Sequence, residues 1–299
     1  MDVYTVTDAD ARIRTGPPAF KWDGRSRIPR YTRVRIMQED GKHVRVSGLQ
    51  GKKFGWTARS NLTRFFKDSD VLQAAPLQPE QPVSASSNMA GTYNRLGGLM
   101  DMLSNETGID VAACLAVWMV ESGGRKHKKD EAVIRFENHL LFREWGDEHA
   151  AIYDEHFQHG GRKGVRGKPW QNHKFKETSS SRFAGFHGKQ NQEYRVLGFA
   201  RTLAGEATAL GCISIGGPQI LVSNHNRIGY RSPKAMYNAF QADERAHVLG
   251  FFDFCGPLIP FLRDEAWISF AAGYNGSGQA AEYGGLIREN FDSARKLLA

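Results

Sequence analysis

Cysteines, long apolar runs and leader-like features are all scarce in this sequence of 299 residues. Its three cysteines, Cys114, Cys212 and Cys255, have apolar neighbours, which predicts reduced core thiols in a protein made in the cytosol rather than a disulfide framework. No run approaches the roughly 18 apolar residues of a membrane span, so we expect no stable membrane insertion. The opening residues, MDVYT, lack the basic and apolar regions of a secretory signal, and we expect none.

What is present indicates a chain with a real core and an uneven charge. Hydrophobic residues make up 40%, mean hydropathy is -0.49, and the length suits two domains. Residues 1–66 hold 14 Lys/Arg and 6 Asp/Glu, a net charge of +8 that equals that of the whole chain. Such a field attracts polyanions. Nucleic acid and anionic cell-wall polymers are two candidates, and a solvated surface with no partner is the third.

The first 66 residues have the pattern of a small all-β barrel. Residues 31–36 and 43–46 alternate apolar with polar, as strands do, and residues 39–42 (EDGK) form a turn signal between them. A further short strand is expected at residues 54–56. Several short strands joined by tight turns predict a barrel.

This segment resembles a bacterial Src-homology-3-like domain. The resemblance rests on ARIRTGP at residues 11–17, the strand at 32–36, GWT at 55–57, and Leu62. The copy differs from the family pattern by Ile13 in place of valine and by an insertion at residues 22–25. The resemblance implies binding to peptidoglycan, as such domains do in bacterial and phage lytic enzymes.

Residues 67–90 are rich in proline, serine and alanine, which predicts a flexible linker that buries little apolar surface. The remainder, 91–299, is mainly helical by its apolar spacing, with a small β element at 132–136. Helices are expected at 93–105, 191–210, 233–254, 265–274 and 282–298. Residues 160–188 are polar and rich in glycine, and they predict an irregular insertion.

Glu121 stands at the end of an apolar run, AACLAVWMVESGG at residues 112–124. The run predicts a buried helix, with Asp110 as N-cap and the two glycines as stop signals. A carboxylate at such a helix end is partly desolvated, which should raise its pKa. A carboxylic acid that stays protonated near neutral pH is what glycoside cleavage needs to protonate the leaving oxygen.

Three motifs follow one another along the chain: ESGG at 121–124, SIGGPQI at 214–220 and AAGYNG at 271–276. Together they resemble the lysozyme-like superfamily, and most closely the N-acetylmuramidase family of modular phage endolysins, over roughly residues 110–299. IRFENHL at 134–140 and Trp267 belong to the same resemblance. It implies a mainly α lysozyme-like catalytic domain with Glu121 as the catalytic acid. The pair of glycines and the proline before Gln219 depart from the family pattern.

Other site residues carry two interpretations each. Glu137, at the end of the expected strand, is either a second catalytic carboxylate or a buried partner of Arg135 or Arg143. Trp118 shares a helical face with Glu121 and either desolvates its carboxyl group beside the substrate or fills the core.

Three polar residues are placed in a sugar-binding cleft by the resemblance alone: Gln219, Tyr274 and Asn275. The two amides provide donors and acceptors for hydroxyl and N-acetyl groups, and the tyrosine provides a ring wall and a hydroxyl.

No metal or cofactor is expected. His139, His149, His156 and His159 lie near acidic residues, but no H-E-x-x-H motif is present, so a zinc amidase or peptidase is the weaker hypothesis.

We therefore expect a multidomain, monomeric phage endolysin: a wall-binding barrel (1–66), a linker (67–90) and a muramidase domain (91–299). It would hydrolyse the β-1,4 bond between N-acetylmuramic acid and N-acetylglucosamine, bind peptidoglycan rather than nucleic acid, and reach the wall from the host cytoplasm after membrane permeabilisation. A lytic transglycosylase giving 1,6-anhydro ends is the enzymatic alternative. A non-catalytic wall-binding or tail protein is the other.

Overall fold

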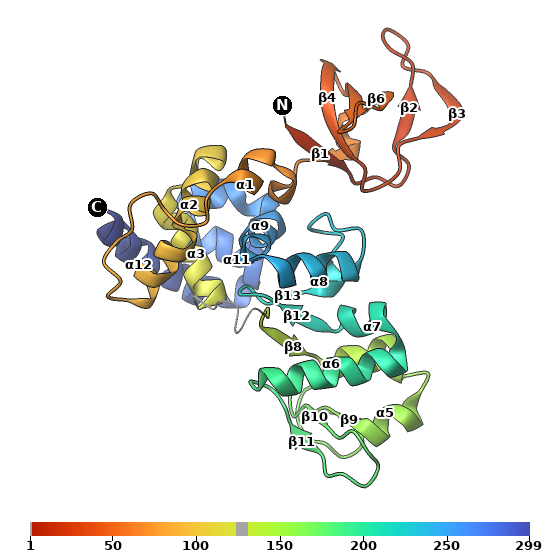
Figure 1. Ribbon diagram of the computed structural model, residues 1–299, viewed down its shortest axis with the longest axis vertical. Helices are drawn as coiled ribbons and strands as arrows, with labels where there is room; N and C mark the ends of the chain where they lie inside the picture. Colours follow the sequence, from red (N-terminus) through yellow and green to blue (C-terminus); the bar gives the residue numbers. More distant parts are fainter. Residues whose placement is uncertain (1, 124–130) are drawn as a thin grey trace. The chain divides into compact units, whose positions relative to one another are not determined.

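The computed structural model describes residues 2–123 and 131–299 (Figure 1). By its internal contacts the chain divides into two compact units. The first unit comprises residues 1–120, 227–229 and 248–299, and the second comprises 121–226 and 230–247. Among the described residues, no helix is both long enough and apolar enough to cross a membrane.

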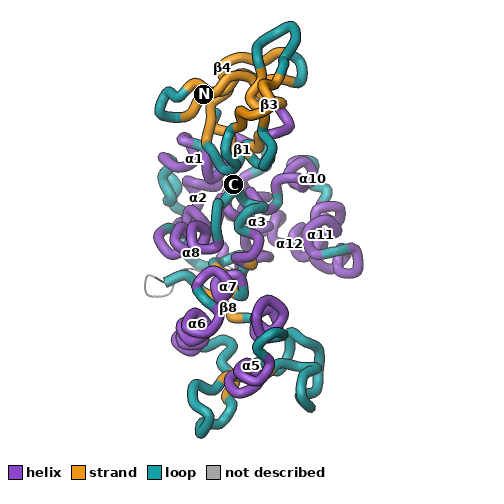
Figure 2. Tube along the Cα trace, turned by 90° about the vertical axis from the view of Figure 1, so that its right-hand side faces the viewer, coloured by secondary structure: helices purple, strands orange, loops and turns teal. Residues whose placement is uncertain are grey.

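The first unit begins with a curled antiparallel sheet (Figure 2). Its strands are β1 (Val3–Val6), β2 (Arg12–Arg14), β3 (Trp22–Arg27), β4 (Arg33–Asp40), β5 (His43–Gly48), β6 (Lys53–Ala58) and β7 (Leu62–Thr63). Their order is β3-β2-β6-β5-β4-β1-β7. The three strands and the turn predicted from alternation are confirmed, since Val44 and Val46 are buried while Arg45 between them is exposed. The segment read as an insertion, 22–25, forms part of β3.

Residues 67–90 pack against the helices of the first unit, which corrects the expectation that they bury little apolar surface. Leu72, in the short helix α1 (Asp70–Ala74), is fully buried, and Leu77 and Val83 pack against the same core. The Asn94 side chain exchanges two hydrogen bonds with the backbone of Val83, at 2.8 and 2.7 Å. Proline and serine content does not predict this packing, because it depends on a few apolar residues in the segment that contact the helices only in the folded chain.

The helices of the first unit surround one apolar core. They are α2 (Asn88–Thr107), α3 (Val111–Ser122), α9 (Glu244–Phe254), α10 (Ile259–Arg263), α11 (Trp267–Asn275) and α12 (Ala280–Leu298). The core draws on almost every turn of α3, as its apolar sequence predicts. The predicted helices at 93–105, 265–274 and 282–298 are confirmed as α2, α11 and α12, with ends shifted by a few residues.

The second unit combines helices with two small sheets. Its helices are α4 (Asn138–Leu141), the π-helix η3 (Phe142–Gly146), α5 (Ala150–His156), α6 (Gln190–Ala204), α7 (Glu206–Gly211) and α8 (Pro233–Ala242). One sheet has the order β13-β12-β8, from β8 (Ile134–Phe136), β12 (Ile213–Ile215) and β13 (Ile220–Leu221). The other has the order β11-β10-β9, from β9 (Phe157–Gln158), β10 (Lys174–Phe175) and β11 (Ala184–Gly185).

Two long predicted helices are each broken in two. The helix expected over 191–210 becomes α6 and α7, because Gly205 takes a φ of +80° that no helix accommodates. The helix expected over 233–254 becomes α8 and α9, because Asp243 is extended and its carboxylate accepts the Arg245 N–H at 2.8 Å, as an N-cap does. Apolar spacing alone cannot detect such breaks, because it continues through them.

The described residues also include five single-turn 3₁₀-helices. They are η1 (Arg59–Asn61), η2 (Phe66–Asp68), η4 (Val222–Asn224), η5 (Gly256–Leu258) and η6 (Ser277–Gln279). The stretch 160–188, expected to be irregular, carries β10 and β11, so it is partly ordered by strand pairing.

Candidate active site

Helix α3 carries Glu121 in its last turn. Residues 112–118 are buried, and Glu121 itself is half-buried. The predicted N-cap is confirmed, because Asp110 Oδ1 accepts the Ala112 N–H at 2.8 Å. Gly123 follows the helix with a φ of +59°, as expected of a stop signal, while Gly124 lies outside the described residues. The chain therefore leaves the buried helix one residue after Glu121.

Trp118 lies in the core of the first unit. Its side chain has no exposed surface and meets the Phe251 ring edge-on, with 5.9 Å between centroids. This favours the core alternative for Trp118 and corrects its assignment as a substrate-binding residue, because a fully buried ring has no face left for a sugar.

Gln219 lies in the turn between β12 and β13. Its Nε2 donates to the carbonyl oxygens of Gly216, at 2.7 Å, and Val133, at 3.2 Å. Gly216 adopts a φ of +80°, and a Cβ there would come within about 3 Å of the rings of Phe240 and His247. Gly216 thus allows the turn to pack closely against Phe240 and His247, and the departure from the family pattern still gives an ordered turn.

Tyr274 and Asn275 end helix α11, and both are half-buried. The Tyr274 ring stacks with Phe270 at 5.8 Å and meets Phe251 edge-on at 5.7 Å. Both residues belong to the first unit, whereas Glu121, Glu137 and Gln219 belong to the second.

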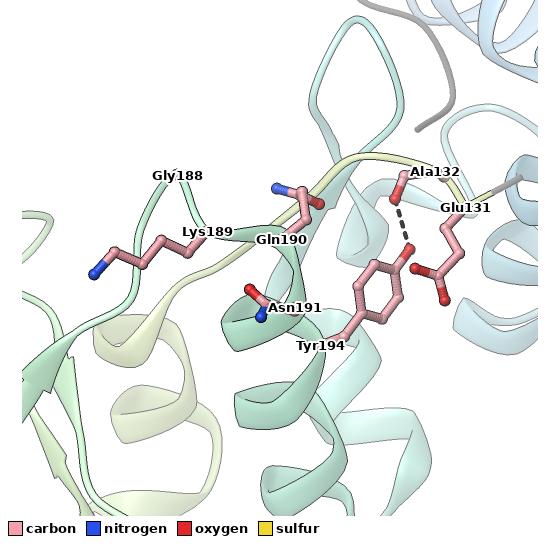
Figure 3. A pocket seen from close by; sticks show the side chains of 7 residues that line it. All are labelled: Glu131, Ala132, Gly188, Lys189, Gln190, Asn191 and Tyr194. Carbon is pink, nitrogen blue, oxygen red and sulfur yellow. Dashed lines mark hydrogen bonds between the residues drawn. The ribbon is translucent and has the colours of Figure 1, made fainter. Parts of the chain in front are cut away.

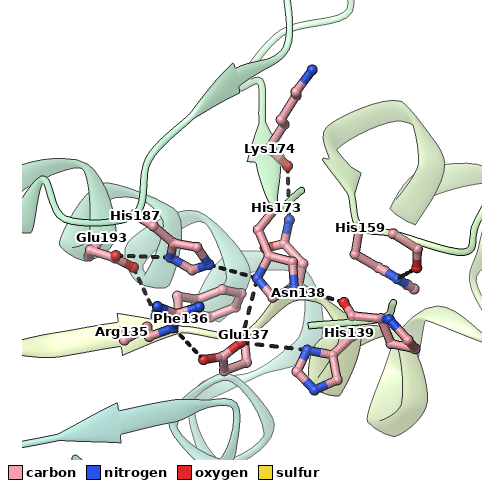
Figure 4. Close-up of polar contacts among 12 residues, drawn as sticks. Arg135, Phe136, Glu137, Asn138, His139, His159, His173, Lys174, His187 and Glu193 are labelled. Atoms are coloured by element: carbon pink, nitrogen blue, oxygen red, sulfur yellow. Dashed lines mark hydrogen bonds and ion pairs between the residues drawn. The ribbon is translucent and has the colours of Figure 1, made fainter. Parts of the chain in front are cut away.

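Glu137 follows β8 and is 9% exposed (Figure 4). Arg135 Nε donates to its Oε1 at 2.7 Å, which confirms one of the two expected partners, whereas Arg143 pairs with Glu144 instead. Its Oε2 lies 3.5 Å from Nδ1 of both His139 and His173. Burial raises the pKa of the Glu137 carboxyl, against the lowering effect of Arg135. Glu137 and Gln219 are thereby held at the same small sheet.

Pattern reasoning missed the histidine network around Glu137. The His187 Nε2 atom lies 2.8 Å from His173 Nδ1, and His187 Nδ1 lies 3.1 Å from Oε1 of Glu193, which is 1% exposed. Burial lowers the pKa of His173 to about 4, so the ring is neutral. His173 and His187 lie in the stretch that looked irregular. Their separation from Glu137 along the chain matches no metal-binding or catalytic motif, because the three residues come together only in the tertiary structure.

The side chains of α6 cover the open edge of β8. Gln190 exchanges hydrogen bonds with both the N–H and the carbonyl of Ile134, at 2.8 and 2.9 Å. A cavity of about 390 Å³ lies beside this edge, lined by Glu131, Ala132, Gly188, Lys189, Gln190, Asn191 and Tyr194 (Figure 3). The Tyr194 hydroxyl donates to the Ala132 carbonyl at 2.6 Å and accepts from Gln241 at 2.6 Å, so it rigidifies the wall of this cavity.

Residues 110–295 match the model of a family described as N-acetylmuramidase. Among solved structures, the chain is similar to the Burkholderia AP3 phage endolysin, with a TM-score of 0.50 and 27% identity over 66% of this chain and 70% of that one. No curated protein matches the chain. The family match spans all six predicted site residues.

Proposed function

This chain belongs to the N-acetylmuramidase family, and from that premise we propose that it is a phage endolysin whose general acid is Glu121. As a family member it is a lysozyme-type glycoside hydrolase that cleaves the β-1,4 bond between N-acetylmuramic acid and N-acetylglucosamine in peptidoglycan. The observation that carries the proposal is the match over residues 110–295, which includes Glu121 at the end of a buried helix.

Glu121 would protonate the glycosidic oxygen as the bond to the sugar breaks. A group in this role must be protonated before the reaction, so it needs an environment that disfavours its charged form. Its half-buried position at the end of a helix of buried apolar residues supports such an environment, and Gly123, two residues later, is exposed. General acid catalysis of this kind typically contributes 10²–10⁴-fold in rate.

Glu137 is proposed as the second carboxylate. Arg135 donates a hydrogen bond to Oε1, and its positive charge stabilises the negative charge of this buried carboxylate. A carboxylate so fixed would orient the attacking water or stabilise an oxocarbenium-like centre. Gln219, Tyr274 and Asn275 are proposed to bind the sugar hydroxyl and N-acetyl groups. The Nε2 group of Gln219 already donates to two backbone carbonyls. We therefore propose that the side-chain oxygen of Gln219 is the atom that faces the ligand.

We also propose that the curled sheet of residues 1–66 is a Src-homology-3-like wall-binding domain. Its net charge of +8 supports attraction to anionic wall polymers. The guanidinium groups of Arg12 and Arg27 lie over the ring of Trp22 on β3, at 4.5 and 4.7 Å from its centroid, and both also pair with Asp10. This edge therefore offers an ordered aromatic surface with a net positive charge. The enzyme would reach the wall from the host cytoplasm after membrane permeabilisation.

Mass spectrometry of digested peptidoglycan tests the reaction. Hydrolysis should leave reducing muramic acid ends. A lytic transglycosylase would leave 1,6-anhydro ends one water lighter, and an amidase would release free stem peptides. Either of these product patterns would overturn the proposed hydrolytic mechanism.

A further inference from the structure

Glu137, His173 and His187 converge in the second unit, and we propose that together they bind one Zn²⁺ ion (Figure 4). One ligand atom from each of the three lies within 4.8 Å of the other two. Two imidazoles and one carboxylate are a recurrent zinc ligand set. The residues come from the end of β8 and from positions beside β10 and β11, so folding alone assembles the site.

The remaining nitrogen of each imidazole is oriented as metal-binding histidines require. Nε2 of His173 lies 2.9 Å from the Pro169 carbonyl oxygen, and Nδ1 of His187 lies 3.1 Å from Glu193 Oε1. These oxygens accept hydrogen bonds, so the proton of each neutral ring sits on the nitrogen that faces them. Such partners fix the tautomer and strengthen the other nitrogen as a ligand.

The tautomers place two lone pairs face to face. His173 Nδ1 and His187 Nε2 are 2.8 Å apart, and the hydrogen bonds at the opposite ring nitrogens direct the lone pairs of these two atoms at each other. Two lone pairs at this distance repel each other unless a cation lies between them. The cation is either a proton shared by the two rings or a metal ion bound to both.

The distances are compatible with a metal ion, and the surrounding polar atoms favour it. Ligand atoms bound at 2.0–2.1 Å around a tetrahedral zinc lie about 3.3 Å apart. Oε2 of Glu137 is 3.5 Å from His173 Nδ1, which fits this value, and the two rings need to separate by only about half an ångström. Oε2 is buried and accepts no hydrogen bond from any described residue, so a single additional proton between the two rings leaves it unsatisfied.

His139 borders the site without joining the ligand set. Its Nδ1 is also buried without a hydrogen bond among the described residues, and it lies 3.5 Å from the same Oε2. The mutually close ligand atoms belong to Glu137, His173 and His187 alone. This set differs from the histidine cluster considered from sequence, since it shares no residue with it.

The ion would have a structural role. Residues 157–188 bury few apolar side chains, chiefly Phe157, Phe175 and Phe186, for a segment of their length. Binding free energy of a metal held by a loop contributes directly to folding. One zinc ion would join this segment to the end of β8 and fix the carboxylate of Glu137 through Oε2, leaving Oε1 to Arg135. A bound ion would therefore give Glu137 a structural role in place of the second-carboxylate role in catalysis. The inference requires no step of the proposed catalysis by Glu121.

Metal binding is tested with untagged, full-length protein freed of metal by EDTA. Zn²⁺ is titrated by calorimetry, Co²⁺ by its visible absorption, and bound metal is counted by mass spectrometry after gel filtration. The variants His173→Gln and His187→Gln each remove a ligand. His149→Gln is the control, because it removes an exposed imidazole that stacks on Trp145. Glu193→Gln removes no ligand. It changes the partner of His187 and the acceptor of the Phe136 and Gly188 N–H groups.

We expect one Zn²⁺ per chain for the unsubstituted protein, His149→Gln and Glu121→Gln, a tetrahedral Co²⁺ spectrum, and a higher Tm with Zn²⁺. Glu193→Gln should bind Zn²⁺ about 10–100-fold more weakly, and the ligand variants more weakly still.

Should the ligand variants fail to fold, the Co²⁺ spectrum and the Zn²⁺ affinity of Glu193→Gln decide between a metal ion and a proton. The proposal is overturned by less than one tight equivalent in the unsubstituted protein, or by equal binding in His173→Gln and His187→Gln; the proton then occupies the site. Failure here leaves the Glu121 assignment untouched, because Glu121→Gln tests that separately.

Discussion

Glu193 of α6 accepts a hydrogen bond from the backbone N–H of Phe136 in β8, with 2.8 Å between Oε2 and the nitrogen. The carboxylate is 1% exposed, and its other oxygen faces His187 and the Gly188 N–H. A helix side chain thus takes the place of a neighbouring strand at the edge of the sheet that precedes Glu137.

Replacing Glu193 should therefore cost stability according to how many acceptors are lost. Glu193→Ala removes the acceptor of the N–H groups of Phe136, which is buried, and Gly188, which is exposed. We expect a loss of about 1–3 kcal/mol from the buried Phe136 N–H. Glu193→Gln retains one acceptor oxygen and should cost clearly less. Urea unfolding of both variants measures the difference. Equal stability of the alanine and glutamine variants would show that the edge of β8 does not depend on this carboxylate.

Glu121→Gln should abolish lysis without unfolding the protein. The amide keeps the size of the side chain but cannot deliver a proton to the glycosidic oxygen, so activity on purified walls should fall at least about a hundredfold. Turbidity clearing gives the rate, and circular dichroism with a Tm gives the fold. Activity above roughly a third of the unsubstituted enzyme, with an unchanged fold, would remove Glu121 from the catalytic role.

Gly98→Ala should separate residues 76–78 from helix α2. A Cβ at this position would lie 2.7 Å from the Pro76 carbonyl oxygen and closer still to that of Gln78, and backbone atoms there have little room to move. We expect a loss of about 1–3 kcal/mol. Gly91→Ala in the same helix is the control, because its Cβ would meet nothing within 4 Å, and helix propensity should make it neutral or stabilising. A similar Tm for both variants would argue against tight packing of this segment.

Asp253 should make stability depend on pH. Its carboxylate accepts the N–H groups of Phe66, at 2.6 Å, and Lys67, at 3.1 Å, and burial raises its pKa to about 8. Because the folded pKa lies above the unfolded one, its contribution to stability is present below about pH 4 and is lost as pH rises through about 8. The difference in unfolding free energy between the unsubstituted protein and Asp253→Asn should fall over this window. A difference that stays constant would contradict the raised pKa.

Wall binding should depend on the charge of residues 1–66. Replacing the exposed Arg45, Lys52 and Lys53 by glutamine should weaken co-sedimentation of the full-length protein with purified peptidoglycan. Added salt should weaken it too, since exposed charges are screened beyond about 8 Å at physiological ionic strength. Replacing Arg288, Arg295 and Lys296 of α12 removes the same charge elsewhere and is the control. Equal loss in both variants would refute a wall-binding role for the sheet, and tight binding to DNA or RNA alone would favour a nucleic-acid partner.

Some features followed from local sequence alone. Alternation placed β4 and β5, because a strand with one buried face must alternate, and the apolar run 112–120 with Asp110 before it predicted α3 and the position of Glu121 at its end. The order of three motifs indicated the family, which the match over residues 110–295 bears out. These patterns are local in the chain, so they can be recognised without knowledge of the fold.

Only the tertiary structure decided the surroundings of each site. The burial of Trp118 against Phe251, the packing of residues 76–83 on α2, and the breaks at Gly205 and Asp243 depend on which surfaces meet. The gathering of Glu137 with His173 and His187 is the strongest case, because these residues are 36 and 14 positions apart along the chain and share no helix or strand. Periodicity predicts which face of a single helix or strand is apolar. A ligand set or a core is made by faces from several elements. Which of these faces contact one another is determined only in the folded chain.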